Sequence, residues 1–167
     1  MTALNKIAAG SRITASEVQA VAPLAAYKSA DQSITSSAVL TNDSALFVSV
    51  LASATYYFKM YIKYEGGTQG SADMKIGWAV PTGTTMSYER LALNTSGAAD
   101  VGTPTDQSGT PTFGSNGAGN SRTLVAEGTV LTSTTAGTLQ FKWAQGTSNG
   151  TATIVHAGSA LVLWQIA

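Results

Sequence analysis

The sequence TYYFKMYIKYE, residues 55–65, alternates large apolar side chains with charged or polar ones. Because successive side chains of a β-strand point to opposite faces, this alternation predicts a strand with one buried face. The buried face is predicted to hold Tyr56, Phe58, Met60, Ile62 and Tyr64. The opposite face is predicted to hold Tyr57, Lys59, Tyr61, Lys63 and Glu65.

The same period of two recurs through most of the chain, with β-branched and aromatic residues enriched in it. Turn residues separate the alternating segments, and Asn42-Asp43 is predicted to be one such turn. Further strands are predicted at 33–40, 46–51, 74–80, 84–93, 123–131, 138–145, 151–156 and 159–166. Eight to ten short strands predict an all-β protein, an antiparallel β-sandwich with an eight-stranded jelly roll as its natural architecture.

The last predicted strand is apolar on both faces, since Leu161 and Leu163 alternate with Val162 and Trp164. Its second face therefore needs a cover. We expect that cover to be another subunit of a homotrimer, with Tyr57, Tyr61, Leu161 and Leu163 at the subunit interface. The alternative is that the N-terminal segment folds back over this face.

Residues 1–27 are predicted to form an arm, and residues 28–167 the β domain. The arm contains one short predicted helix, because Thr14 and Glu17 form a capping box and Pro23 ends the apolar pattern. A helix of about eight residues is too short to persist alone in water, so the arm needs a docking partner.

Residues 94–121 are rich in glycine and small polar residues, and Val101 and Phe113 are their large apolar side chains. A loop of this length without secondary structure is uncommon in a compact domain. It is predicted to be either an excursion that makes contacts or a partly mobile segment.

The charge pattern argues against two classes of partner. Charged residues make up 11% of the chain, and nine basic residues balance nine acidic ones. They are scattered singly, so neither nucleic acid nor a membrane surface is an expected partner.

The sequence offers few residues for catalysis or metal binding. It has no cysteine, and His156 is its single histidine, beside a predicted turn. We interpret His156 as a structural residue at the rim of the domain. The carboxylates Glu65, Asp73, Glu89 and Glu127 are interpreted as solvated surface charges. No catalytic residue, metal or cofactor is therefore predicted.

Exposed aromatic rings could instead stack on neutral sugars. The candidates for such a glycan groove are Tyr57, Tyr61, Tyr88 and Trp143. We favour the other interpretation, in which the tyrosines line a subunit contact and Trp143 belongs to the core.

Several segments carry a resemblance to a known group of proteins. They are LFVSVL at 46–51, YYF at 56–58, and ADMK at 72–75 leading to WAVP at 78–81. AGTLQFKWAQ at 136–145, VHAGSAL at 155–161 and GSRITA at 10–15 extend the match. With these segments the chain resembles tail and capsid-accessory proteins of phages that infect actinobacteria.

The resemblance implies a virion component with a tumour-necrosis-factor-like jelly roll that assembles as a homotrimer. It would be made in the host cytoplasm and lie on the outer surface of the capsid or tail. The arm would then bind the major capsid or tail protein through Ile7, Ile13, Val18 and Val21. We expect a capsid decoration protein, with a minor tail protein or a module recognising host cell-surface glycan as the alternatives.

Overall fold

The computed structural model describes residues 12, 14, 22–101 and 104–167. They form two antiparallel sheets and hold no helix, and so none that could cross a membrane. The larger sheet contains β1 (Leu24–Tyr27), β2 (Gln32–Ile34), β4 (Thr55–Glu65), β6 (Thr85–Leu93), β7 (Ala99–Val101), β8 (Thr105–Asp106), β10 (Arg122–Leu131), β12 (Thr153–Val155) and β13 (Ala160–Gln165). The smaller sheet contains β3 (Thr41–Val50), β5 (Met74–Ala79), β9 (Thr112–Phe113) and β11 (Gly137–Gln145).

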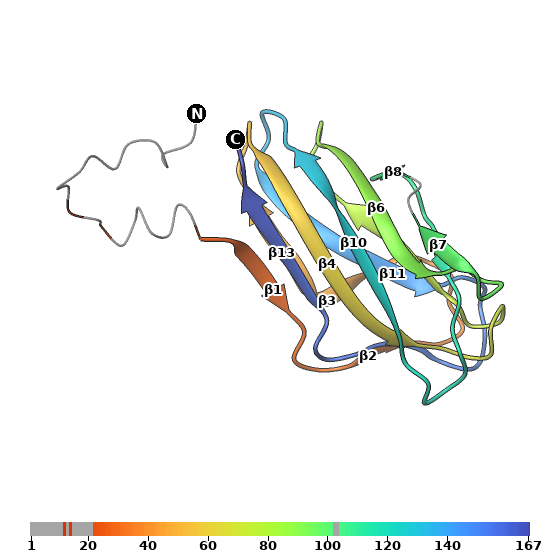
Figure 1. Ribbon diagram of the computed structural model, residues 1–167. Coiled ribbons are helices and arrows are strands. Elements are labelled where there is room, and N and C mark those ends of the chain that lie inside the picture. The colour runs from red at the N-terminus through yellow and green to blue at the C-terminus, as the bar shows by residue number, and fades with distance from the viewer. Residues whose placement is uncertain (1–11, 13, 15–21, 102–103) are drawn as a thin grey trace.

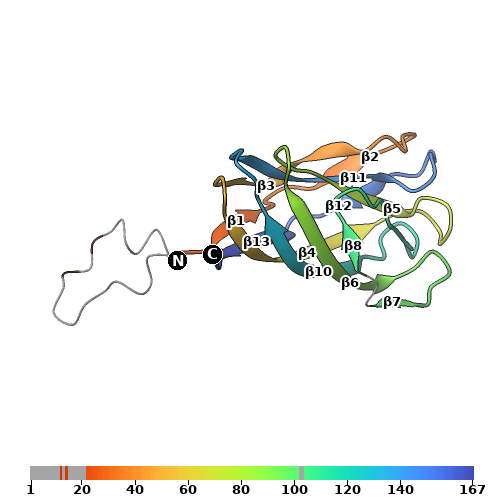
Figure 2. The ribbon, with the colours of Figure 1, turned by 90° about the horizontal axis from the view of Figure 1, so that it is seen from above.

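The main strands of the larger sheet follow the order β1-β13-β4-β10-β6-β7, and the smaller sheet follows β3-β11-β5-β9. Figure 1 shows β13, β4, β10 and β6 side by side, with β11 crossing behind them. The view from above in Figure 2 shows the two layers. The chain enters and leaves the smaller sheet at each of its strands, β3, β5, β9 and β11, since the strands before and after each of them belong to the larger sheet. The predicted all-β class with two packed antiparallel sheets is thus confirmed.

The core lies between the sheets, where the period-two pattern predicts it. The inward residues of β4, from Tyr56 to Tyr64, are at most 1% exposed. Edge-to-face ring contacts join Phe58, Trp78, Tyr88 and Phe141 across both sheets, with centroids 5.5–6.2 Å apart. Gly128 of β10 lies opposite both Phe58 and Tyr88. A Cβ atom there would come within 2.1 Å of the Ser87 carbonyl oxygen, so only glycine fits this close to the backbone of β6.

Several predicted boundaries differ from the observed ones. Strand β4 has the predicted bounds, but the strand predicted at 33–40 is limited to β2. The segment 94–121 is not a structureless loop, because it contains β7, β8 and β9. The predicted helix after Thr14 lies outside the described residues, and so do the predicted anchoring residues Ile7, Ile13, Val18 and Val21.

The predicted boundary between the arm and the β domain, at residue 27, falls within the ladder that β1 forms with β13. Strand β1 belongs to the larger sheet, where Leu24 lies opposite Leu163 and Tyr27 opposite Ala160. The ladder continues past β1, since the Lys28 N–H donates to the Ser159 carbonyl over 2.9 Å. Without β1, the backbone N–H and C=O groups on one edge of β13 would have no hydrogen-bond partner. The pairing with β1 satisfies these groups, so residues from Leu24 onward belong to the sheet.

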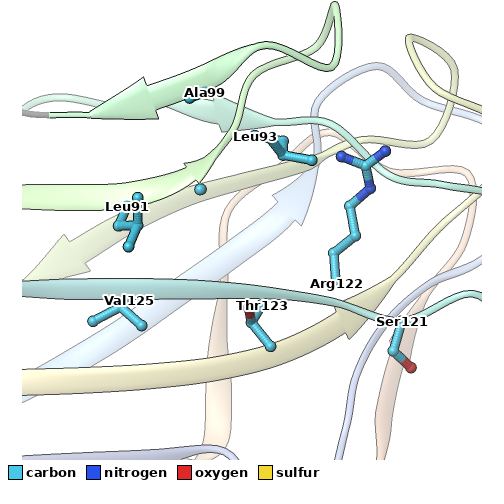
Figure 3. A pocket seen from close by; sticks show the side chains of 8 residues that line it. Leu91, Leu93, Ala99, Ser121, Arg122, Thr123 and Val125 are labelled. Atoms are coloured by element: carbon cyan, nitrogen blue, oxygen red, sulfur yellow. The ribbon is translucent and has the colours of Figure 1, made fainter.

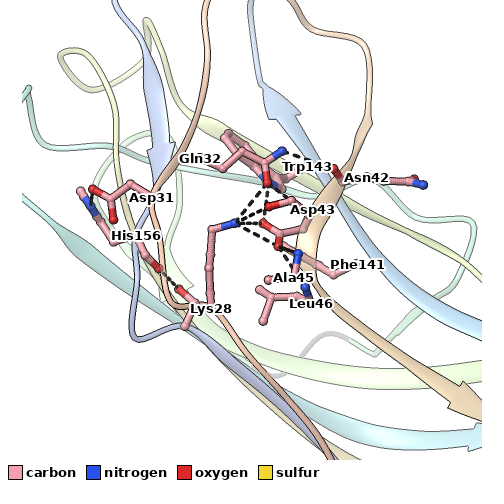
Figure 4. A network of polar contacts seen from close by, with 12 residues as sticks. Lys28, Asp31, Gln32, Asn42, Asp43, Ala45, Leu46, Phe141, Trp143 and His156 are labelled. Atoms are coloured by element: carbon pink, nitrogen blue, oxygen red, sulfur yellow. Dashed lines mark hydrogen bonds and ion pairs between the residues drawn. The ribbon is translucent and has the colours of Figure 1, made fainter.

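The predicted turn at Asn42-Asp43 is instead part of β3, and Asp43 takes part in a buried ion pair (Figure 4). The Lys28 Nζ atom lies 2.9 and 3.1 Å from the two carboxylate oxygens of Asp43, and neither side chain is more than 1% exposed. The Asp43 carboxylate also accepts hydrogen bonds from the indole Nε1 of Trp143 and from the N–H groups of Ala45 and Leu46. A shift in the β3–β11 register accompanies this arrangement. The Asp43 carboxylate thus accepts hydrogen bonds from backbone N–H groups of β3 that have no partner on β11 at the bulge.

We expect Lys28→Met to lower the free energy of unfolding by about 3–5 kcal/mol, because it leaves the Asp43 charge buried without its cation. The measurement is urea unfolding followed by tryptophan fluorescence. Lys59→Met is the matched control, since Lys59 pairs with Glu127 at 3.5 Å with both side chains about half exposed. Its expected loss is below about 1 kcal/mol, and equal losses in the two variants would contradict the role assigned to the buried pair.

The buried tyrosines predict a loss of stability at alkaline pH. Burial raises the pKa of Tyr64 and of Tyr88 above the ordinary value of 10.0. Between pH 10 and these raised values the unfolded chain loses tyrosine protons that the folded chain keeps. The free energy of unfolding is therefore expected to fall above pH 10, by up to about 1.4 kcal/mol per pH unit for each tyrosine.

Urea unfolding measured between pH 8 and pH 11 tests this expectation. Tyr64→Phe removes one of the two groups, so its stability should fall less steeply with pH than that of the parent chain. Identical slopes for the parent and Tyr64→Phe would count against it.

Candidate functional site

The outward face of the larger sheet carries a cluster of aromatic side chains at its β1 side. We call Tyr27, Tyr57, Tyr61 and Trp164 the aromatic patch. Tyr27 is 66% exposed, Tyr61 44% and Trp164 38%. Strand register brings them together, since Tyr27 and Tyr61 both lie opposite Ala160, and Tyr57 lies opposite Trp164. The rings of Tyr57 and Trp164 are 5.8 Å apart. Tyr27 and Tyr61 flank the small side chain of Ala160, and Lys59 lies between Tyr57 and Tyr61 along β4.

Polar contacts hold one ring of the patch, that of Tyr57, in place. The Tyr57 hydroxyl donates to the Glu127 carboxylate over 2.8 Å, and Lys59 lies beside the same carboxylate. The hydrogen bond to Glu127 raises the pKa of Tyr57. The same bond, with the charge of Lys59, lowers the pKa of Glu127. Tyr57 therefore stays protonated and fixed, which limits the conformational entropy that a partner would have to remove.

The tyrosines predicted at the subunit interface lie on this surface, but the leucines predicted with them do not. Leu161 and Leu163 are 0% exposed and lie opposite Met60 and Phe58 in the core. Their side chains cannot reach another subunit, so that part of the prediction is wrong. The outward residues of β13 include Trp164, which the same alternation places with Tyr57.

Tyr27 was also missed as a surface residue, because the sequence places it at the end of the arm. The signal that could have identified it is the continuation of the period of two through β1. Ala25 and Tyr27 share the outward face with Val162 and Ala160.

The glycan groove considered from the sequence does not form with its four residues. Tyr88 is 1% exposed and Trp143 is 0% exposed, so both belong to the core and offer no ring to a sugar. The interpretation of Trp143 as a core residue is confirmed.

His156 lies at the end of β12, as its predicted place at the rim suggests, but its contacts are distant in sequence (Figure 4). Its Nδ1 atom is 3.1 Å from Asp31 Oδ2 and its Nε2 atom 3.3 Å from Glu65 Oε2. The backbone N–H of Ala157 and then the His156 ring lower the pKa of Asp31. The Ser159 hydroxyl donates to the His156 carbonyl oxygen rather than to the ring. Asp31, next to β2, and Glu65, in β4, thus hold the His156 ring in place. The contacts of His156 therefore serve the fold.

The carboxylates interpreted as solvated surface charges differ in exposure, and the side chain of Glu65, which contacts His156, is only 15% exposed. Glu89 and Glu127 are exposed on the outward face, but Asp73 is buried at 3% exposure. Asp73 accepts hydrogen bonds from the N–H groups of Gly70 and Ser115, so it joins two loops. The solvated interpretation is wrong for Asp73. In the part of the chain that the structure describes, no three histidine, aspartate or glutamate side chains gather as metal ligands do.

Comparisons with known proteins give no close relative. No family model matches the chain, and no curated protein matches it in sequence. Among solved structures, the tripod from the baseplate of bacteriophage Tuc2009 is similar over 95% of this chain and 72% of its own, with 15% identity and a TM-score of 0.36.

Two structures of infectious bursal disease virus are similar over shorter parts of their own length. The Gx strain structure gives 9% identity and a TM-score of 0.22, with 87% of this chain and 38% of that chain covered. The VP2 subviral particle gives 11% identity and a TM-score of 0.22, with 88% and 41% covered. Likenesses at these TM-scores assign no function to the chain.

Proposed function

We propose that this protein is a non-enzymatic structural component of a phage virion, a capsid decoration protein of the cement or head-fibre kind. It assembles as a homotrimer through the aromatic patch and lies on the outer surface of the particle. The observation that carries the proposal is the aromatic patch itself, with three large rings exposed on one sheet face.

Two physical arguments support a subunit contact at the patch. Soluble monomers rarely expose a contiguous apolar surface without a partner, and tyrosine and tryptophan are enriched where proteins meet. The rings also lie on strands β1, β13 and β4 rather than on loops. A rigid surface loses little conformational entropy on association, so the patch is suited to a permanent contact.

The strand order supports the jelly-roll part of the proposal. The eight strands concerned are β3, β4, β5, β6, β7, β9, β10 and β11. Numbered one to eight in chain order, they form one sheet in the order 1-8-3-6 and the other in the order 2-7-4-5. This is the connection pattern of two Greek keys wound into a jelly roll, to which β1, β2, β12 and β13 add.

Anchoring to the particle is proposed for the residues ahead of β1. Ile7, Ile13, Val18 and Val21 would bind the major capsid protein, and three arms per trimer would multiply a weak single contact. A minor tail protein would use the same assembly and the same arm, with the tail protein as partner. The position of the protein in the particle distinguishes the two.

Light scattering of the purified protein tests the assembly. We expect a mass three times 17.1 kDa for the parent chain and a monomer for Tyr61→Glu, because a carboxylate in the patch would lose its water at the interface. Phe47→Glu is the matched control, since Phe47 is 47% exposed on the smaller sheet and should leave the mass unchanged. A monomeric parent chain would refute the trimer.

The anchoring proposal predicts a different result for a chain that begins at Ala22. It keeps the β1 ladder and should keep the trimer mass, but should no longer sediment with phage particles that lack the native protein. Binding to particles equal to that of the full chain would exclude the arm as the anchor.

A further inference from the structure

The outward face of the larger sheet contains a cleft between β6 and β10 (Figure 3). The cleft lies away from the aromatic patch, because β1 and β13 are at the other end of the strand order. The two strands pair from Thr85 opposite Leu131 to Leu91 opposite Val125, and then they separate. The end of β6 turns to another partner, because the Leu93 carbonyl accepts a hydrogen bond from the Gly114 N–H. The separation leaves a cleft of about 400 Å³. This volume lies within the range of roughly 300–1,000 Å³ that is usual for small-molecule sites.

The walls of the cleft are mainly apolar, and one cation lies among them. Leu91, Leu93, Ala99 and Val125 supply hydrocarbon surface, and Arg122 crosses from β10 toward Leu93 (Figure 3). Such a lining suits a ligand with an aliphatic body and one anionic group.

The Arg122 guanidinium is only partly satisfied. Its Nη2 atom donates to the Asn116 side-chain oxygen over 3.2 Å. Its Nε and Nη1 atoms are shielded from solvent and have no hydrogen-bond partner among the described residues. Within the same residues, no carboxylate lies within ion-pair distance of Arg122. Buried N–H groups of a cation are rarely left unpaired, so the site lacks an acceptor and a counter-charge.

We propose that this cleft binds an aliphatic carboxylate, with its hydrocarbon chain between Leu91, Leu93 and Val125 and its carboxylate on Arg122. The planar guanidinium can donate two parallel hydrogen bonds, and these match the two oxygens of a carboxylate. A small rotation of the Arg122 side chain is part of the proposal, since its unpaired N–H groups must turn toward the ligand. The site is separate from the aromatic patch, so the inference does not depend on the trimer.

Calorimetric titration of the full chain with butanoate, hexanoate and octanoate tests the proposal. Each further buried methylene is expected to tighten binding about fourfold, from about 0.8 kcal/mol per methylene, until the cleft is filled. Octanamide has a body of the same size without the charge, and acetate has the charge without the body. Both should bind at least about tenfold more weakly than octanoate.

Variants separate the charge from the apolar walls. Arg122→Met should abolish the preference for octanoate over octanamide, whereas Arg122→Lys should keep part of it. Leu91→Glu should abolish octanoate binding. Leu131→Glu is its matched control, because Leu131 is also exposed but lies at the far end of the β6–β10 ladder. Circular dichroism checks that each variant is folded.

Two results would overturn the site: octanoate binding no tighter than octanamide, or an unchanged preference in Arg122→Met. A water molecule that satisfies Arg122 would give the first of these. The mass measured by light scattering is independent of both, so a failure here and a failure of the trimer are distinguishable.

Discussion

The buried ion pair between Lys28 and Asp43 joins the edge of one sheet to the edge of the other, and the surface features beside it depend on this junction. A charge that is 0% exposed is tolerated only when partners surround it, and the Lys28 Nζ atom has Asp43 and Gln32 as partners. The pair therefore fixes where β1 leaves the larger sheet and where β3 bends. Side chains alternate along the chain, so an inward Lys28 requires an outward Tyr27. The outward position of Tyr27 in the aromatic patch follows from a buried charge on the other face of the same segment.

The period of two was sufficient to predict the all-β class and the core face of β4, because every inward residue of β4 is large and uncharged and all its charged residues lie on the other face. It could not assign the faces of β13, where both are apolar. That assignment depends on register, which places Leu161 and Leu163 against Met60 and Phe58. The sequence also could not show that Asp43 is a buried partner. Aspartate after asparagine is typical of turns, and only the distant Lys28 and Trp143 give it another role.

The two halves of the outward face differ in how their strands are bonded. On the β1 side, β13 pairs with β4 along its whole length, so the outward side chains of the two strands lie in adjacent rows. On the β6 side, the ladder opens after Leu91, and the surface becomes concave. The alternation in β10 places the start of the Arg122 side chain on the inward side with Leu124 and Ala126, and the side chain lines the cleft where the β6–β10 ladder opens. The opening of the ladder was not predictable from the sequence, because it depends on Gly114 from a distant segment.

The ladder between β1 and β13 also determines how the domain resists a mechanical load. A pull applied through Pro23 acts along the axis of β1, which pairs antiparallel with β13. Such a pull loads all the hydrogen bonds of this ladder together, in shear. Lys28 follows directly and would have to leave its buried partners before the strand could slide. Resistance to a pull depends on the rate of unfolding rather than on equilibrium stability. A load applied through this end of the chain must break the hydrogen bonds of the β1–β13 ladder together. A load applied through a loop would instead break the bonds of a ladder one at a time.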